Sequence, residues 1–312
     1  MANYGYLQVT RDCNQNCRFC SNPPSGKNDL DIGEAKNIIK KHMEDGCAGI
    51  IFTGGEPTIY DGLVELISYC RENNIEAKLI SNGQKLADYE YFSSLIDAGL
   101  TMIHLSMYSC KDEVQAFLSG NNESLANIKK TLDNTSKFPD LTISINTTIC
   151  KQNSNHLKEN VCWTLDRYPV IKHFVWNNLD PLGNRAVDNP DTIPSLVDFE
   201  IELKQAADYL IANNKSFRIE RVPLCYLPGY EHLSTETRKI VMKESRNIYF
   251  LDDVRGYFKQ DVWSYKKGEC CEICTLKDIC VGLYDGGGSY KLEELYPVFI
   301  EKDEVIGKIL EN

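Results

Sequence analysis

The pattern that most constrains the fold of this chain is a short apolar run followed by a helical pattern, which recurs along residues 5–177. We expect six strands, which are Gly5–Thr10, Ala48–Phe52, Ala77–Ile80, Met102–Ser106, Leu141–Ile149 and Lys172–Asn177. Helical periodicity falls between them, over Ile32–Asp45, Leu63–Asn73, Tyr91–Ala98, Leu125–Thr135 and His156–Tyr168. This alternation predicts an α/β fold, with a parallel sheet covered by helices and ligands at the carboxyl ends of the strands.

The composition changes after the sixth expected strand. Residues 180–194 contain three prolines and few apolar residues, and a long helical pattern, Leu196–Asn213, comes next. Stretches of this kind are typical of boundaries between structural units. We therefore place a boundary near residue 185, which divides the chain into residues 1–185 and an irregular region of residues 186–312.

The charge of the chain limits its partners. It has 312 residues, with 34 Lys or Arg and 45 Asp or Glu, so the net charge is −11. This balance disfavours nucleic acid, because a phosphate backbone would be repelled. The sequence has no run of about 18 apolar residues, so no membrane span is expected. Met1–Thr10 lacks the basic flank and apolar stretch of a signal peptide, so we expect a cytoplasmic protein.

The chain has 13 cysteines. Cytosolic thiols stay reduced and an odd number cannot all pair, so a disulfide framework is not expected. One group, Cys13, Cys17 and Cys20, has the spacing C-x3-C-x2-C directly after the first expected strand. Three thiolates in one loop suit a metal centre. A structural zinc site usually has four protein ligands, whereas a [4Fe–4S] cluster held by three cysteines keeps one iron open.

This loop, with the aromatic Phe19 before its last cysteine, resembles the signature of the radical S-adenosylmethionine (SAM) enzymes. The resemblance implies a partial (βα)6 barrel of the TIM type, a [4Fe–4S] cluster on Cys13, Cys17 and Cys20, and SAM bound at the open iron. In that family, reduction of the cluster cleaves SAM to a 5′-deoxyadenosyl radical, which abstracts a hydrogen atom from the substrate. A structural zinc knuckle is the alternative for this loop.

A second motif of the family, Gly54-Gly55-Glu56-Pro57, ends the second expected strand. Glycines let a backbone approach a ligand closely, and a carboxylate can accept hydrogen bonds from an ammonium. The resemblance implies that this motif holds the amino group of SAM. It also implicates further strand-end residues in SAM binding, namely Ser81, Asn82, Ser106, Asn146 and Thr148. Tyr108 stands where one branch of the family often has Asp.

A second cysteine group, with the spacing C-x2-C-x5-C, lies at residues 271–280. It resembles the SPASM extension of the family, but a different residue stands where that extension has its next cysteine. We interpret it as a shortened, twitch-type extension with one auxiliary [4Fe–4S] cluster. The expected ligands are Cys225, Cys271, Cys274 and Cys280. Cys270 in place of Cys271, and a zinc site of four thiolates, are the alternatives.

Cys270 is then a spare thiol. Some members of the family donate a hydrogen atom from a cysteine to a substrate radical, which inverts a carbon centre. Cys270 is a candidate for this role, as is Cys225 if only three residues hold the auxiliary cluster. The alternative is a cysteine that merely neighbours a ligand. Polar candidates for substrate contact are Asn177, Asp180, Arg218, Glu220 and Arg221.

The resemblance predicts a radical SAM enzyme that modifies a peptide at a C–H bond by epimerisation, cross-linking or oxidation. One alternative substrate is an amino sugar or cyclitol, on which the enzyme would act as a dehydrogenase or epimerase, and another is RNA. A protein of a different class, a two-cluster iron–sulfur electron carrier, is a further alternative. The Gly-Gly-Glu-Pro motif argues against it, because a pure electron carrier needs no SAM pocket. We expect a monomer that receives electrons from a reductant such as flavodoxin or ferredoxin.

Overall fold

The computed structural model describes residues 3–22, 29–182, 184–252 and 255–311. Within them the chain forms one nine-stranded sheet with the order β7-β6-β5-β4-β3-β2-β1-β8-β9. The strands are β1 (Tyr4–Thr10), β2 (Gly49–Gly54), β3 (Glu76–Ser81), β4 (Leu100–Ser106), β5 (Thr142–Ile149), β6 (His173–Asn178), β7 (Ser216–Glu220), β8 (Arg246–Tyr249) and β9 (Tyr257–Gln260). All neighbours are parallel except β8 and β9, which are antiparallel. The prediction of an α/β fold with a mostly parallel sheet is confirmed.

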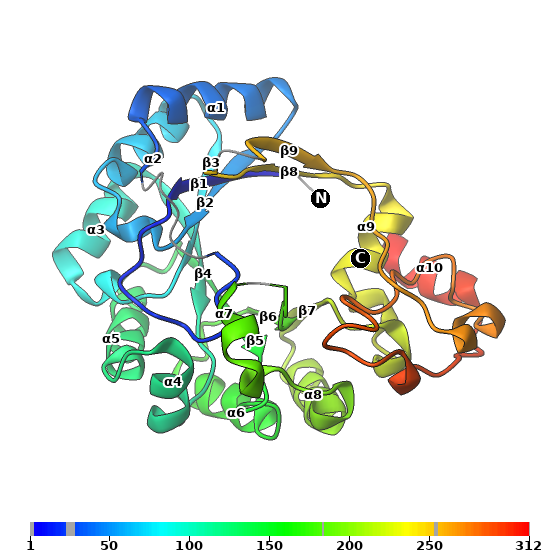
Figure 1. Ribbon diagram of the computed structural model, residues 1–312. Helices are drawn as coiled ribbons and strands as arrows, with labels where there is room; N and C mark the ends of the chain where they lie inside the picture. Colours follow the sequence, from blue (N-terminus) through cyan, green and yellow to red (C-terminus); the bar gives the residue numbers. More distant parts are fainter. Residues whose placement is uncertain (1–2, 23–28, 183, 253–254, 312) are drawn as a thin grey trace.

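Helices lie around the outside of the curved sheet (Figure 1). The helices of the described residues are α1 (Ile32–Glu44), α2 (Leu63–Glu72), α3 (Tyr89–Ala98), α4 (Asp112–Ser119), α5 (Ser124–Thr135), α6 (Leu157–Arg167), α7 (Asn184–Asp188), α8 (Leu196–Ala212), α9 (Thr235–Met242) and α10 (Lys302–Glu311), of which α7 lies over the middle of the ring of strands in Figure 1. Asp31 caps α1, because its side chain accepts a 3.0 Å hydrogen bond from the Glu34 N–H. Helix α4 escaped prediction because, of its buried residues, only Leu118 is apolar.

The main hydrophobic core lies between the sheet and the outer helices. Leu7 and Val9 of β1 are fully buried and belong to the same core as Ile39 of α1 and Leu66 of α2. Gln8, between them, lines a cavity on the other face, as the alternation of side chains along a strand requires. Each fully buried aliphatic side chain contributes about 1.5–3 kcal/mol to folding. The apolar outer face of the sheet therefore stabilises the fold, while polar side chains such as Gln8 lie on the inner face.

The sheet continues past the expected boundary near residue 185. Strand β7 pairs with β6 through Trp176 and Ile219, and β8 pairs with β1 through Tyr6 and Ile248. Residues on both sides of that boundary therefore share one sheet. Because β7 and β9 are the two ends of the strand order, the described sheet is open between them. In Figure 1 the C-terminal segment, in orange and red, lies on the side of this opening.

No helix among the described residues combines the length and the apolar character needed to cross a membrane.

Candidate active site

The loop after β1 carries the first three cysteines. The Gln15 N–H donates to the Cys13 sulfur at 3.4 Å, and the Asn22 N–H donates to the Cys20 sulfur at the same distance. The Cys17 sulfur lies 3.8 Å from the Tyr108 hydroxyl. Hydrogen bonds of this kind stabilise sulfur ligands and tune iron–sulfur centres.

Two glycines at the end of β2 hold this loop in place. The Gly55 N–H donates to the Thr10 carbonyl and the Glu56 N–H to the Asp12 carbonyl, each at 2.8 Å. A Cβ atom on Gly54 would overlap the Thr10 carbonyl, and one on Gly55 would overlap the Asp12 carbonyl. We expected these glycines to admit a ligand. In the structure, the close approach that demands glycine is that of the cysteine loop itself.

The Glu56 carboxylate joins the loops after β2 and β3. One of its oxygens accepts from the Thr58 N–H at 3.0 Å, the Thr58 hydroxyl at 2.6 Å and the Ser81 hydroxyl at 2.8 Å. The other accepts from the Asn82 N–H at 2.7 Å. Burial raises the pKa of this carboxyl, and these hydrogen bonds oppose the shift. Glu56 therefore sets the relative positions of two strand ends as well as facing a pocket.

These strand ends surround a pocket of about 240 Å³. Most of the predicted SAM-site residues line it, namely Cys13, Cys17, Cys20, Gly54, Gly55, Glu56, Ser81, Asn82, Ser106 and Thr148. Pro57 and Asn146 are not among its lining residues. Pro57 begins a buried 3-10 turn, and the Asn146 side chain accepts a 2.5 Å hydrogen bond from Asn177.

Several lining residues were not predicted as part of a SAM site. They are Gln15, Ser21, Thr53, Ile80, Tyr108, Asp180 and Arg221. Asp180 and Arg221 had been expected only as substrate contacts. Tyr108 packs edge-on against Phe19, with ring centroids 4.9 Å apart. The presence of Phe19 within the cysteine motif was the sequence feature that could have indicated an aromatic residue packed against this loop.

Burial keeps two thiols of the loop in their protonated form. Burial raises the pKa of Cys13 to about 11 and that of Cys17 to about 12, so both are protonated thiols at neutral pH unless a metal displaces the proton. Across the part of the chain that the structure describes, no three His, Cys, Asp or Glu side chains are placed to hold one metal ion.

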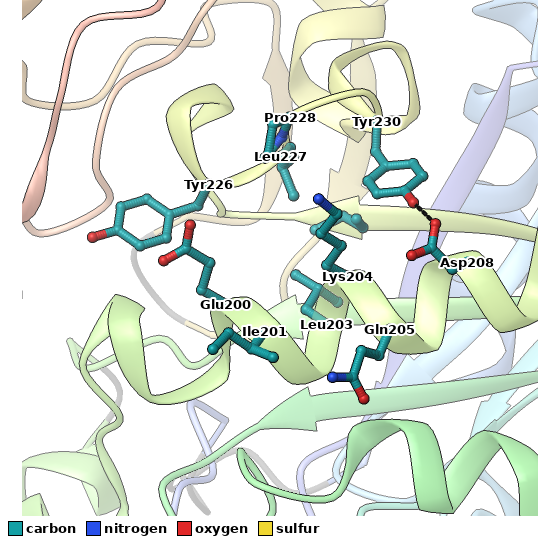
Figure 2. Close-up of a pocket in the computed structure, with 11 residues that line it drawn as sticks. Glu200, Ile201, Leu203, Lys204, Gln205, Asp208, Tyr226, Leu227, Pro228 and Tyr230 are labelled. Carbon is teal, nitrogen blue, oxygen red and sulfur yellow. Dashed lines mark hydrogen bonds between the residues drawn. The ribbon is translucent and has the colours of Figure 1, made fainter.

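A larger hollow lies elsewhere and contains none of the predicted site residues. Figure 2 shows this pocket of about 410 Å³ between α8 and residues 226–230. The hydroxyl of Tyr230 donates to the Asp208 carboxylate at its edge. Because it lacks a cysteine and lies away from the carboxyl ends of β1 to β5, we assign the active site to the pocket at those strand ends.

The comparison with known proteins agrees with this geometry. Residues 7–161 match the Radical SAM superfamily. This part of the chain is a radical SAM domain. It contains β1 to β5 and therefore most of the strand ends that form the pocket.

The relatives of the radical SAM domain extend over more than this region. The chain is 29% identical over 198 residues to the PqqA peptide cyclase of Bradyrhizobium diazoefficiens, which covers 59% of this chain and 49% of that protein. The chain thus spans about half the length of this curated relative.

Solved structures show the same fold. Native anSMEcpe with bound AdoMet superposes with a TM-score of 0.67 at 16% identity, over 99% of this chain and 96% of that one. Streptococcus suis SuiB bound to precursor peptide SuiA has a TM-score of 0.65 at 16% identity, over 93% of this chain and 74% of that one. At these identities the likeness concerns the fold alone.

Beyond the radical SAM domain, four cysteines surround a small hollow of about 20 Å³, and they are Cys225, Cys271, Cys274 and Cys280. The Val298 N–H donates to the Cys274 sulfur and the Gly282 N–H to the Cys280 sulfur, both at 3.4 Å. Cys270 does not line this hollow, and its thiol donates to the Leu295 carbonyl at 3.4 Å. It also lines neither the SAM-site pocket nor the cavity next to it.

That neighbouring cavity, which we call the inner cavity, has a volume of about 450 Å³. It shares Ser21, Asp180 and Arg221 with the pocket of the radical SAM domain, so the two hollows adjoin. Of the predicted substrate contacts it contains Asp180, Glu220 and Arg221, but neither Asn177 nor Arg218. Its other charged and aromatic residues were not predicted, and they are Glu236, Arg246, Arg255, Phe250, Phe258, Trp263, Tyr265 and Tyr284.

Proposed function

We propose that this chain is an enzyme that cleaves SAM reductively and abstracts a hydrogen atom from a peptide substrate. The observation that carries the proposal is the pocket of about 240 Å³, which collects three cysteines together with Glu56, Ser81 and Thr148 at the carboxyl ends of parallel strands. A pure electron carrier would not need such a pocket beside its cluster.

The donor set of the pocket fits the expected cofactors. Cys13, Cys17 and Cys20 would hold a [4Fe–4S] cluster by three thiolates, which keeps one iron open. When bound and reduced, this cluster supplies the electron for the cleavage of SAM. The polar groups of Ser81, Asn82, Ser106 and Thr148 would then bind and orient SAM.

A peptide substrate is supported by the relatives and by the inner cavity. One relative is named a PqqA peptide cyclase, and the similar structure of SuiB was solved with the precursor peptide SuiA bound. The inner cavity of about 450 Å³ adjoins the SAM pocket and has room for a segment of substrate. Ser21, Asp180 and Arg221, which face both hollows, would contact the substrate next to SAM.

The second cysteine group supports an auxiliary cluster. Cys225, Cys271, Cys274 and Cys280 line one hollow, and the sulfurs of Cys274 and Cys280 receive backbone hydrogen bonds, as cluster ligands do. The position of Cys271 favours it over Cys270 as the ligand. We propose an auxiliary [4Fe–4S] cluster at these four thiols.

Anaerobic reconstitution followed by iron analysis and product detection tests both parts. We expect about eight irons per chain, as two [4Fe–4S] clusters require, and 5′-deoxyadenosine after the addition of SAM and dithionite. Cys17→Ala should abolish 5′-deoxyadenosine, while Cys162→Ala, outside both cysteine groups, should not. Bound zinc with about four irons would contradict the auxiliary cluster. The absence of 5′-deoxyadenosine under strong reduction, with peptide present, would contradict the enzyme.

A further inference from the structure

One carboxylate of the inner cavity has an oxygen without a partner. The Glu236 side chain lines the cavity and is 3% exposed. Its Oε1 atom accepts a 3.0 Å hydrogen bond from the Arg221 N–H. Its Oε2 atom is buried, and no residue that the structure describes offers it a hydrogen bond. A buried carboxylate oxygen is rarely unpaired in a folded protein, so this atom is available to a ligand.

The charges that line the inner cavity form a mixed set. They are the carboxylates Asp180, Glu220 and Glu236 and the guanidinium groups Arg221, Arg246 and Arg255. Arg255 is already paired at 2.6 Å with Asp252, which is not a lining residue. This cation therefore does not offset a carboxylate of the cavity.

A second cation of the cavity is also committed. Arg246 pairs with Glu220 at 3.3 Å. What remains is Asp180 and Glu236 beside Arg221, so two carboxyl groups share one guanidinium group. The backbone of Arg221 has a φ of 59°, an uncommon left-handed conformation for a side chain of this size, and its N–H is bound by Glu236. The turn at Arg221 thus places the backbone N–H of this residue beside the Glu236 carboxylate.

Burial, and then the nearby Glu220 carboxylate, raise the pKa of Glu236. This direction is the one expected where positive charge is in short supply. Lys239 does not make up the shortage inside the cavity. Its ammonium lies 4.9 Å from the ring centroid of Trp263 and lines a separate hollow together with Glu244.

The remaining walls are aromatic, and two of their rings already face guanidinium groups, because Arg246 lies 5.4 Å from the ring centroid of Trp263 and Arg221 lies 5.3 Å from that of Tyr284. Trp263, Tyr265 and Tyr284 line the cavity, and the rings of Tyr265 and Tyr284 meet edge-to-face with centroids 4.9 Å apart. Aromatic faces attract ammonium and guanidinium groups, and they also pack against the apolar stem that carries such a group.

We propose that the inner cavity binds a cationic group of the substrate, an ammonium or guanidinium, at the free Oε2 atom of Glu236. A lysine or arginine side chain, or a free amino terminus, carries this chemistry. The proposal rests on the proposed function, because it takes the cavity beside the SAM pocket to be the place where the substrate binds. Glu236 is then a residue that selects the substrate by charge.

Binding of small blocked amino acids to the anaerobically reconstituted protein tests this proposal. The probes are N-acetyl-lysine N-methylamide, its Nε-acetylated neutral counterpart and N-acetyl-glutamate N-methylamide, with affinities measured by ligand-detected NMR in the presence of SAM. We expect the lysine probe to bind at least ten-fold more tightly than its neutral counterpart. In Glu236→Gln, which keeps an acceptor for the Arg221 N–H, the preference should fall below two-fold.

Glu231→Gln is the matched control, because Glu231 is also buried but lies outside the cavity. It should keep the full preference for the lysine probe. Tighter binding of the glutamate probe, or an undiminished preference in Glu236→Gln, would overturn the proposal. If Glu236→Gln does not fold, the order of the three probes on the unmodified protein decides. SAM cleavage is measured separately, so a failure of the proposed function remains distinguishable from a failure of this binding site.

Discussion

The Asn82 N–H and the Glu56 carboxylate are joined by a hydrogen bond of 2.7 Å, which ties the loop after β3 to the loop after β2. This bond is fully buried, and the same carboxylate also receives Ser81 and Thr58. Glu56, which the sequence motif predicts to contact a ligand, therefore also holds two loops of the pocket together.

Replacement of this carboxylate should damage both stability and binding. In Glu56→Gln, an amide NH2 faces a donor in place of an oxygen, which leaves a buried group unsatisfied. We expect a loss of about 1–3 kcal/mol in the free energy of unfolding and at least ten-fold weaker SAM binding, measured by urea denaturation and equilibrium dialysis. Glu65→Gln is the control, because that carboxylate is 57% exposed and its pair with Lys36 is worth at most about 1 kcal/mol. Equal effects of the two substitutions would contradict the structural role of Glu56.

The glycine that supports the cysteine loop should be intolerant of any side chain. In Gly55→Ala, the new methyl group would overlap the Asp12 carbonyl and displace the loop that bears Cys13. We expect reconstituted iron to fall by about four atoms per chain, the content of one [4Fe–4S] cluster. Gly307→Ala, in α10 with open space around it, should retain all iron and stabilise the helix by up to about 1 kcal/mol. Full iron content in Gly55→Ala would show that the loop does not depend on this contact.

The two adjacent cysteines of the C-terminal group should behave differently. Cys271 lines the hollow shared with the other cysteines, whereas the Cys270 thiol donates to the Leu295 carbonyl. We expect Cys271→Ala to lose about four irons and Cys270→Ala to keep them, as followed by iron analysis and electron paramagnetic resonance. The reverse result would assign Cys270 as the ligand.

The same Cys270→Ala protein tests the predicted hydrogen-atom donor. A donor role requires that 5′-deoxyadenosine still forms while inverted product disappears. Because Cys270 lines neither the SAM pocket nor the inner cavity, we expect product formation to continue unchanged.

Acid should destabilise the protein through its buried histidines. Burial lowers the pKa of His42 from 6.5 to about 4, so the unfolded state takes up a proton at a higher pH than the folded state does. Stability is therefore present above pH 6.5 and is lost as the pH falls toward 4. For His42 alone the loss amounts to about 1.4 kcal/mol between pH 8 and pH 5.5.

Urea denaturation at pH 8 and pH 5.5 measures this loss. His42→Gln should reduce the difference between the two pH values by about 1.4 kcal/mol relative to the unmodified protein. An unchanged difference would show that His42 does not contribute to the acid sensitivity.

Much of the site could be predicted because parallel strands end at one edge of a sheet. The family resemblance pointed to Ser81 and Thr148 among the residues near these strand ends, and both line the pocket. Asn146 was placed on the same ground but lies two residues earlier than Thr148 on β5, which is a step of about 6.6 Å along the strand. From there it pairs with Asn177 instead. Sequence position near a strand end does not specify how deep a side chain lies.

The sequence by itself determined the alternation of strands and helices, the cysteine loop after β1 and the Gly-Gly-Glu-Pro turn, because each of these depends on residues close together in the chain. Only the tertiary structure decided that β8 pairs with β1 and that Cys271 rather than Cys270 faces the other cysteines. It also decided that the Glu236 carboxylate accepts the Arg221 N–H in the wall of the inner cavity. These relationships depend on distances between segments remote in sequence, and packing of the whole chain sets those distances.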